Sequence, residues 1–184
     1  ISTGSSVIDK SIDHVFVHLY PGSVQAVRHL VDVGCDRIAC VTPWPLDPRF
    51  DAYTLVMREL GRREECIVID HDNRASAMTC LRAYIDTNGV PSGLFCHNDD
   101  TAIACYKALF DMGIRVPDDV CIVGCDGIDE TEYMPAAIST IVTPMEELSL
   151  TAWEFLHNRL NSPATELQQR VITPQLVVRA SSQR

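Results

Sequence analysis

Short apolar runs alternate with amphipathic stretches along most of the chain. The apolar runs, rich in Val, Ile, Leu and Cys, cover residues 14–17, 37–42, 66–69, 93–96, 120–125, 138–142 and 170–178. Runs this continuous are typical of strands buried on both faces. Helical patterns lie between them at residues 23–33, 49–60, 75–87, 99–112 and 144–160. This alternation predicts an α/β fold built on a parallel, doubly wound sheet.

Length and charge narrow the possible functions. The 184 residues are enough for one substantial core, and their net charge is −10. No basic run is longer than Arg62-Arg63, so this chain lacks the basic face with which proteins hold a phosphate backbone. No apolar run approaches the roughly 18 residues that a membrane span needs, so no membrane contact is expected.

The eight cysteines favour a reduced, cytoplasmic chain. None forms a C-x-x-C pair, and most sit inside apolar runs, where Cys acts as a small buried hydrophobe. A secreted disulfide framework is the alternative.

Signatures of enzymes are scarce. The sequence contains no G-x-G-x-x-G, P-loop, G-x-S-x-G or H-E-x-x-H motif, and its six histidines are dispersed. His97 is a candidate general base, but it has no evident nucleophile beside it. We therefore predict no catalytic residue, no cofactor and no metal site.

Polar side chains follow the predicted strands at the end where ligands bind in an open parallel sheet. In chain order they are Trp44 and Arg49, residues 70–73, Asn98 and Asp99, and then Asp126 and Asp129. Arg offers a planar fork of donors, Asn offers a donor and an acceptor, and an ionised Asp accepts from two hydroxyls. Together with a flat apolar wall from Trp44, these groups suit a neutral, polyhydroxylated ligand.

Each of these residues also has a purely structural interpretation. Asp126 precedes Gly127 and suits a turn, whereas Asn98 and Asp99 suit the N-cap of the following helix. Trp44 stands between two prolines and suits packing as well as stacking. Arg49 suits a solvated helix start, although a cation there opposes the helix dipole.

Several short motifs occur in a specific order between residues 14 and 184. They are His29-Leu30 before Gly34, Arg37-Ile38-Ala39, Arg49 followed by Tyr53, residues 91–99, Gly113 with residues 116–120, Val123-Gly124 with Asp126, Ser139-Thr140-Ile141, and residues 174–181. In this order and spacing they resemble the effector-binding portion of the LacI/GalR family of transcriptional regulators. Cys125 departs from that pattern, because an aromatic residue is frequent just before the aspartate.

The resemblance implies a type I periplasmic-binding-protein-like fold with two α/β lobes joined by three crossings. The chain is then mainly the C-terminal lobe (residues 34–139), with fragments of the N-terminal lobe. Residues 1–33 are the tail end of the N-terminal lobe, 140–169 cross back to it, and 170–184 form a final strand and tail. The earlier strands and a helix-turn-helix headpiece are expected upstream of residue 1.

The resemblance also implies a function. A small-molecule effector, a sugar or related metabolite, would lie between the lobes and be held by Arg49, Asn98 and Asp126. Thr143 and Met145 on the crossover would be weaker contacts. Operator DNA would bind through the absent headpiece, and the protein would be a homodimer. The rival interpretations are a solute-binding receptor of a sugar transport system and an enzyme on an α/β scaffold.

Overall fold

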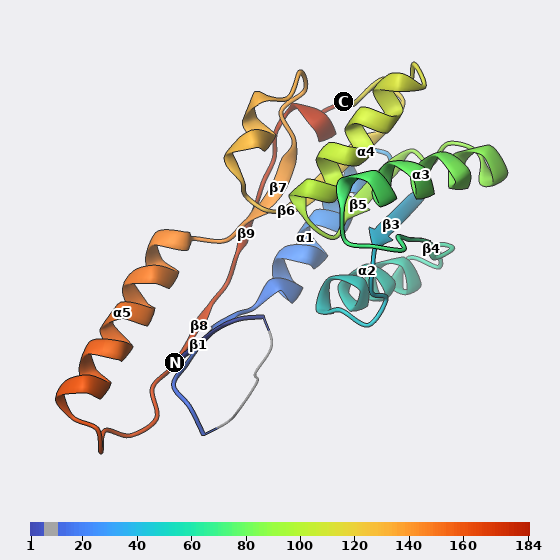
Figure 1. Ribbon diagram of the computed structural model, residues 1–184. Coiled ribbons are helices and arrows are strands. Elements are labelled where there is room, and N and C mark those ends of the chain that lie inside the picture. The colour runs from blue at the N-terminus through green and yellow to red at the C-terminus, as the bar shows by residue number, and fades with distance from the viewer. Residues whose placement is uncertain (6–10) are drawn as a thin grey trace.

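The computed structural model describes residues 1–5 and 11–184, which form two β-sheets with helices around them (Figure 1). The larger sheet has the strand order β4 (Glu65–Val68), β3 (Ile38–Thr42), β5 (Gly93–Cys96), β6 (Cys121–Asp126), β7 (Ser139–Val142) and β9 (Gln175–Val177). The smaller sheet has the order β1 (Ser2–Gly4), β2 (His14–Val17) and β8 (Gln169–Ile172). Neighbouring strands are parallel except for β7 and β9. The predicted α/β class with a parallel sheet is confirmed.

Helices cover both faces of the larger sheet. Helices α1 (Leu19–Asp32) and α2 (Pro48–Glu59) pack on one face, and α3 (Arg74–Asn88) and α4 (Asp99–Asp111) pack on the other. Along β3, Ile38 and Cys40 join the core under the first pair, whereas Ala39 and Val41 join the core under the second. Successive residues of a strand point to opposite faces, so burial of both faces requires the unbroken apolar runs of the sequence.

The chain passes between the two sheets at three places. These are His18 between β2 and α1, Thr143-Pro144 between β7 and α5 (Met145–Asn161), and Thr173-Pro174 between β8 and β9. In Figure 1, α5 and the smaller sheet extend away from the larger sheet and its four helices. Arg159 joins α5 to the start of β2 through hydrogen bonds of 2.6 and 2.9 Å to the Asp13 carboxylate. These hydrogen bonds hold the pKa of Asp13 well below its usual range.

One predicted strand is wrong in its extent. The apolar run at residues 170–178 is two short strands, β8 and β9, in different sheets, with Pro174 between them. Proline has no backbone N–H, so it interrupts a hydrogen-bonded ladder, and here the chain leaves one sheet for the other.

The domain boundary predicted at residue 33 assigns the first helix to the same lobe as the smaller sheet. In the structure, α1 packs on the larger sheet and contacts β5, β6, β7 and β9. Gly22 allows this close approach. A Cβ at this position would lie 2.8 Å from Ile141 Cγ2 and 3.0 Å from the Pro174 carbonyl oxygen. The passage from the smaller to the larger sheet therefore occurs at His18.

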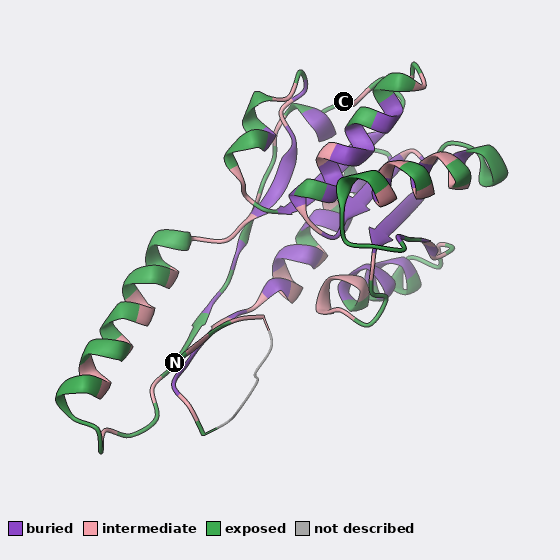
Figure 2. Cartoon of the chain, viewed as in Figure 1, coloured by how far each residue is buried: buried purple, intermediate pink, exposed green. Residues whose placement is uncertain are grey.

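Helix α5 has no buried residue (Figure 2). Its apolar side chains Leu150, Trp153 and Leu160 are 61%, 67% and 71% exposed. Across residues 1–5 and 11–184, no helix combines the length and the apolar character required to cross a membrane.

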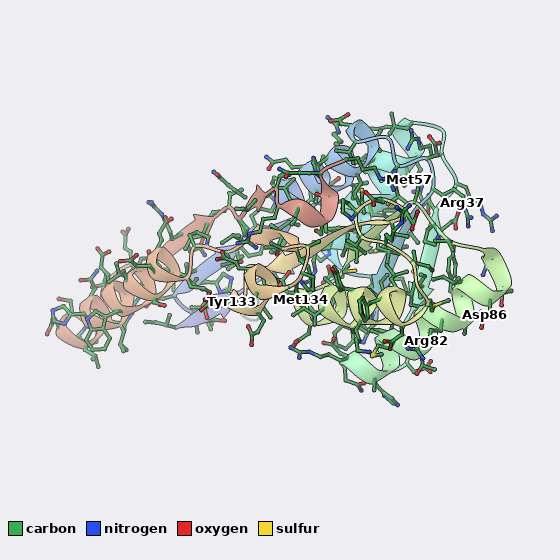
Figure 3. All side chains as sticks on the ribbon, turned by 90° about the horizontal axis from the view of Figure 1, so that it is seen from above. Arg37, Met57, Arg82, Asp86, Tyr133 and Met134 are labelled. Atoms are coloured by element: carbon green, nitrogen blue, oxygen red, sulfur yellow. The ribbon has the colours of Figure 1, made fainter. Side chains whose placement is uncertain are left out.

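An ion pair between Arg37 and Glu65 lies at the amino ends of β3 and β4 in the larger sheet. Arg37 binds both oxygens of the Glu65 carboxylate at 3.1 and 2.8 Å, and Tyr84 donates to the same carboxylate. Figure 3 shows Arg37 and Asp86 at the end of the larger part that is farthest from α5. The carboxyl ends of the strands form the opposite edge.

Candidate functional site

The carboxyl ends of the parallel strands gather the predicted site residues at one edge of the larger sheet. Trp44 follows β3, Asn98 follows β5, Asp126 ends β6 and Thr143 follows β7. Helix α2 begins at the same edge and supplies Arg49. We call this set of residues the carboxyl edge. Five of the six predicted side chains lie there, and Met145 follows two residues after Thr143 as the first residue of α5.

Arg49 is held firmly at the carboxyl edge. Its Nε and Nη2 donate to the two oxygens of Asp47 at 2.7 and 2.8 Å, and its Nη1 donates to the His97 carbonyl oxygen at 2.7 Å. The two side chains are only 12% and 16% exposed. Burial acts to lower the pKa of Arg49, but the hydrogen bonds to Asp47 outweigh it and raise the pKa above its ordinary value. The guanidinium is therefore charged, oriented and largely neutralised by its partner.

Asn98 is the N-cap of α4. Its Oδ1 accepts from the Thr101 backbone N–H at 2.8 Å, and its Nδ2 lies 3.4 Å from Asp72 Oδ1. The capping interpretation is thus correct for Asn98, and its amide nitrogen still faces the carboxyl edge. The capping interpretation of Asp99 is wrong, because Asp99 is fully buried and accepts from Gly127 N, Ile128 N and Thr140 Oγ1.

Asp126 has an unusual backbone. Its φ is +125°, the one positive φ at a non-glycine among the residues described, and Gly127 follows with φ +83°. Such a conformation is costly for a residue with a Cβ and is found where the surroundings fix it. The residue is exposed, yet neighbouring protein desolvates its carboxyl, and this together with the charge of Asp99 raises the pKa to about 6, against the attraction of Arg49.

The side chains of His97 and Trp44 lie against each other at the carboxyl edge. The indole of Trp44 is 57% exposed and meets the His97 ring edge-on, with 6.0 Å between the ring centroids. Burial, and then the positive charge of Arg49, lower the pKa of His97 to about 4, so the imidazole is neutral at pH 7. Its Nδ1 is buried and has no hydrogen-bond partner among the described residues. Because its indole is exposed, Trp44 is not a core residue of the part of the chain that the structure describes.

Thr143 and Met145 lie on the crossover to α5. The Thr143 backbone N–H donates to the Asp126 carbonyl oxygen at 3.3 Å, so this crossover begins beside Asp126. Met145 is the first residue of α5 and is 58% exposed.

Two carboxylates have roles that were not predicted from the sequence: Asp47 was not singled out, and Asp99 was interpreted as a cap. Asp47 has a recognisable signal, because Asp followed by Pro48 is a common way to begin a helix, and its Oδ1 caps α2 through Arg49 N at 2.8 Å. Asp99 has no local signal, because its partners lie 28 to 41 positions further along the chain.

The carboxyl edge offers donors and acceptors of hydrogen bonds but no nucleophile paired with a base. Arg49 is already paired with Asp47, while Asp72 and Asp126 add further negative charge. An anionic ligand would meet net repulsion at such an edge. A neutral ligand with several hydroxyl groups fits it, because each carboxylate accepts from hydroxyls and Trp44 offers an apolar face.

Known proteins share both the sequence and the fold. The model of the periplasmic binding protein-like domain matches residues 27–182. The transcriptional repressor PurR of Photobacterium profundum is 31% identical over 166 residues, which are 87% of this chain and 50% of that protein. The ribose operon repressor of Escherichia coli K12 is 29% identical over 168 residues, which are 88% of this chain and 51% of that protein. The chain thus spans about half the length of these curated relatives.

Solved structures share the fold. A LacI family regulator from Enterococcus faecium with bound ribose has a TM-score of 0.89 and 22% identity, over 98% of this chain and 69% of that one. A LacI family regulator from Arthrobacter sp. FB24 in complex with lactose has a TM-score of 0.88 and 24% identity, over 97% of this chain and 70% of that one. From the matched model, the chain belongs to the periplasmic binding protein-like domain family.

Proposed function

We propose that this chain is the effector-sensing part of a LacI/GalR-type transcriptional regulator, with the effector bound at the carboxyl edge. The observation that carries the proposal is the meeting of Arg49, Asn98 and Asp126 at one edge of a single parallel sheet. In this proposal the three side chains hold the effector between two lobes, with Trp44, Thr143 and Met145 as further contacts. The lobes correspond to the two sheets, and the three crossings form the hinge.

The proposed effector is a neutral sugar. Arg49 is neutralised by Asp47, and the remaining charges at the edge are negative, which disfavours a sugar acid or sugar phosphate. Ribose and lactose occupy the related regulators named above, which supports a sugar for this chain as well. The effector would act through its different affinity for the open and closed lobe arrangements.

The proposal extends to the partners of the full-length protein. A helix-turn-helix headpiece would bind operator DNA, the protein would act in the cytoplasm as a homodimer, and the exposed faces of α3 and α4 would be the dimer surface. The named relatives are repressors, which favours a regulator over a transport receptor or an enzyme.

A thermal-shift screen of the full-length protein tests the choice of ligand. Ribose, lactose and cellobiose represent neutral sugars, and galacturonate and ribose 5-phosphate represent anions. A sugar present at 100 times its Kd stabilises the folded state by about 2.7 kcal/mol, which raises the Tm. A shift caused only by the anions would refute the assignment of a neutral effector.

A further inference from the structure

Asp99 is a fully buried carboxylate that is bound entirely by neutral donors. Its Oδ2 accepts from Gly127 N at 2.7 Å and from Ile128 N at 3.0 Å, and its Oδ1 accepts from Thr140 Oγ1 at 2.6 Å. Burial raises the pKa of Asp99 and outweighs these three hydrogen bonds, which lower it, so the net shift is upward. The two backbone N–H groups can only donate, so a proton on Oδ2 would face donors in place of an acceptor, and a proton on Oδ1 would require the Thr140 hydroxyl to turn and accept it. Three hydrogen bonds donated to the carboxylate therefore fit the ionised form.

The donors come from the segment that follows Asp126 and from the neighbouring strand. Gly127 and Ile128 are the two residues after Asp126, so Asp99 fixes the backbone directly after the residue with the strained φ. Gly124 makes room for the Asp99 carboxylate, because a Cβ there would lie 2.2 Å from Asp99 Oδ1. The Thr140 hydroxyl, on β7, donates a hydrogen bond to the same carboxylate, and the crossover to α5 begins after β7. One carboxylate thus holds both the two residues after Asp126 and the neighbouring strand β7.

We propose that Asp99 is a positioning residue of the effector site, whose buried carboxylate fixes the backbone after Asp126 and so presents the Asp126 side chain at the carboxyl edge. The statement about the effector rests on the proposed function, but the hold of Asp99 on this backbone is a property of the sugar-free protein. Burying a charge that has no cationic partner in hydrogen-bond range costs free energy of folding. We attribute this buried charge to its role in fixing the backbone after Asp126.

The charge of Asp99 gives a readout that a merely structural role would not move. The groups that influence the Asp126 carboxyl are Asp99 and Asp100, which raise its pKa, and Arg49 and the Cys125 thiol, which lower it. Asp99→Asn removes one negative charge but keeps the shape. The amide oxygen still accepts from Gly127 and Ile128, and the amide nitrogen donates to the Thr140 hydroxyl. We therefore expect the titration midpoint of Asp126 to move to lower pH in this variant.

The experiment uses the full-length protein without sugar. Nuclear magnetic resonance follows the ¹³C signal of the Asp126 carboxyl with pH, and hydrogen exchange follows the amides of Gly127 and Ile128. In Asp99→Asn the two amides keep their protection and the Asp126 midpoint falls. In Asp99→Ala the two amides exchange at least about tenfold faster, because a charge-assisted hydrogen bond is lost, while the amides of β3 and β5 are unchanged. Asp111→Asn, at the far end of α4, is the control and changes neither readout.

An Asp126 midpoint that is unchanged in Asp99→Asn overturns the proposal, and this holds even if Asp99→Ala does not fold. Unchanged exchange of Gly127 and Ile128 in folded Asp99→Ala also overturns it. Titration with ribose, lactose and cellobiose at pH 8 then separates the two claims, with about tenfold weaker sugar binding expected for Asp99→Ala. The absence of sugar binding by the wild type, together with the expected amide and carboxyl changes, counts against the proposed function and supports the positioning.

Discussion

Replacing Arg49 should destabilise the protein as well as weaken effector binding. The guanidinium makes two hydrogen bonds to Asp47 and one to the His97 carbonyl, and both side chains of the ion pair are mostly buried. Arg49→Met keeps much of the aliphatic stem but leaves the Asp47 carboxylate without a countercharge. Asp47→Asn removes the charge while its side-chain oxygen still caps α2.

The magnitude follows from the burial of the pair. Breaking a buried ion pair by removing one partner costs about 3–5 kcal/mol, and the remaining solvent contact places this pair at about 3 kcal/mol. For a chain of this length, that cost corresponds to a fall in Tm of about 6–12 °C. Burial raises the pKa of Asp47, but the hydrogen bonds from Arg49 outweigh it, and the net shift is downward. Its contribution is therefore present above the unfolded pKa of about 4 and is lost as pH falls through the lower, folded-state pKa.

A double-mutant cycle in urea at pH 7 measures the coupling between Arg49 and Asp47. We expect a coupling free energy of about 2–3 kcal/mol, because each charge-assisted hydrogen bond is worth about 1.5–3 kcal/mol and the two share one partner. The matched control is the exposed pair Arg28 and Glu59, at 2.9 Å with side chains 57% and 47% exposed. That pair should give at most about 1 kcal/mol. A coupling below about 0.5 kcal/mol for Arg49 and Asp47 would refute the reasoning.

Three further substitutions test other parts of the account. Asp126→Gly should stabilise the fold by about 1 kcal/mol in urea unfolding, because glycine tolerates the positive φ of +125°, and should abolish sugar binding; a loss of stability would show that the backbone there is unstrained. Trp44→Ala should weaken sugar binding about tenfold with little change in Tm, since the indole is 57% exposed, whereas a large fall in Tm would assign it to packing. Tyr53→Phe should cost about 1–3 kcal/mol, because the buried hydroxyl donates to Ile38 O at 2.8 Å and accepts from Glu65 N at 2.7 Å; an unchanged unfolding midpoint would contradict that network.

The fold could be predicted from the sequence because its signals are local. Strands β3, β5 and β6 are buried on both faces and appear as unbroken apolar runs, and residues 93–96 were predicted with the bounds that β5 has. The three residues of β1 are too few to show a period. The separation of β8 from β9 depends on which sheet each strand joins, a property that the run at residues 170–178 does not carry. Pro174 is the feature of the sequence that could have indicated the break between the two strands.

The site was predicted less completely, because it depends on contacts between distant segments. The positions of Arg49, Asn98 and Asp126 follow from the rule that parallel strands end at one edge. The pairing of Arg49 with Asp47 and the grip of Asp99 on residues 127 and 128 require the three-dimensional structure. The sequence also favoured Asp99 as a cap, and the cap is its neighbour Asn98.

The central claim is that the carboxyl edge binds a neutral sugar through Asp126. Calorimetric titration of the full-length wild type and Asp126→Ala with the sugar that gives the largest thermal shift tests it most directly, with Asp111→Ala as the control. The account predicts binding by the wild type and the control, and a loss of at least about 100-fold in Asp126→Ala at an unchanged folded fraction, as expected when a charged hydrogen-bond acceptor is removed. Equal affinity of wild type and Asp126→Ala would contradict the account.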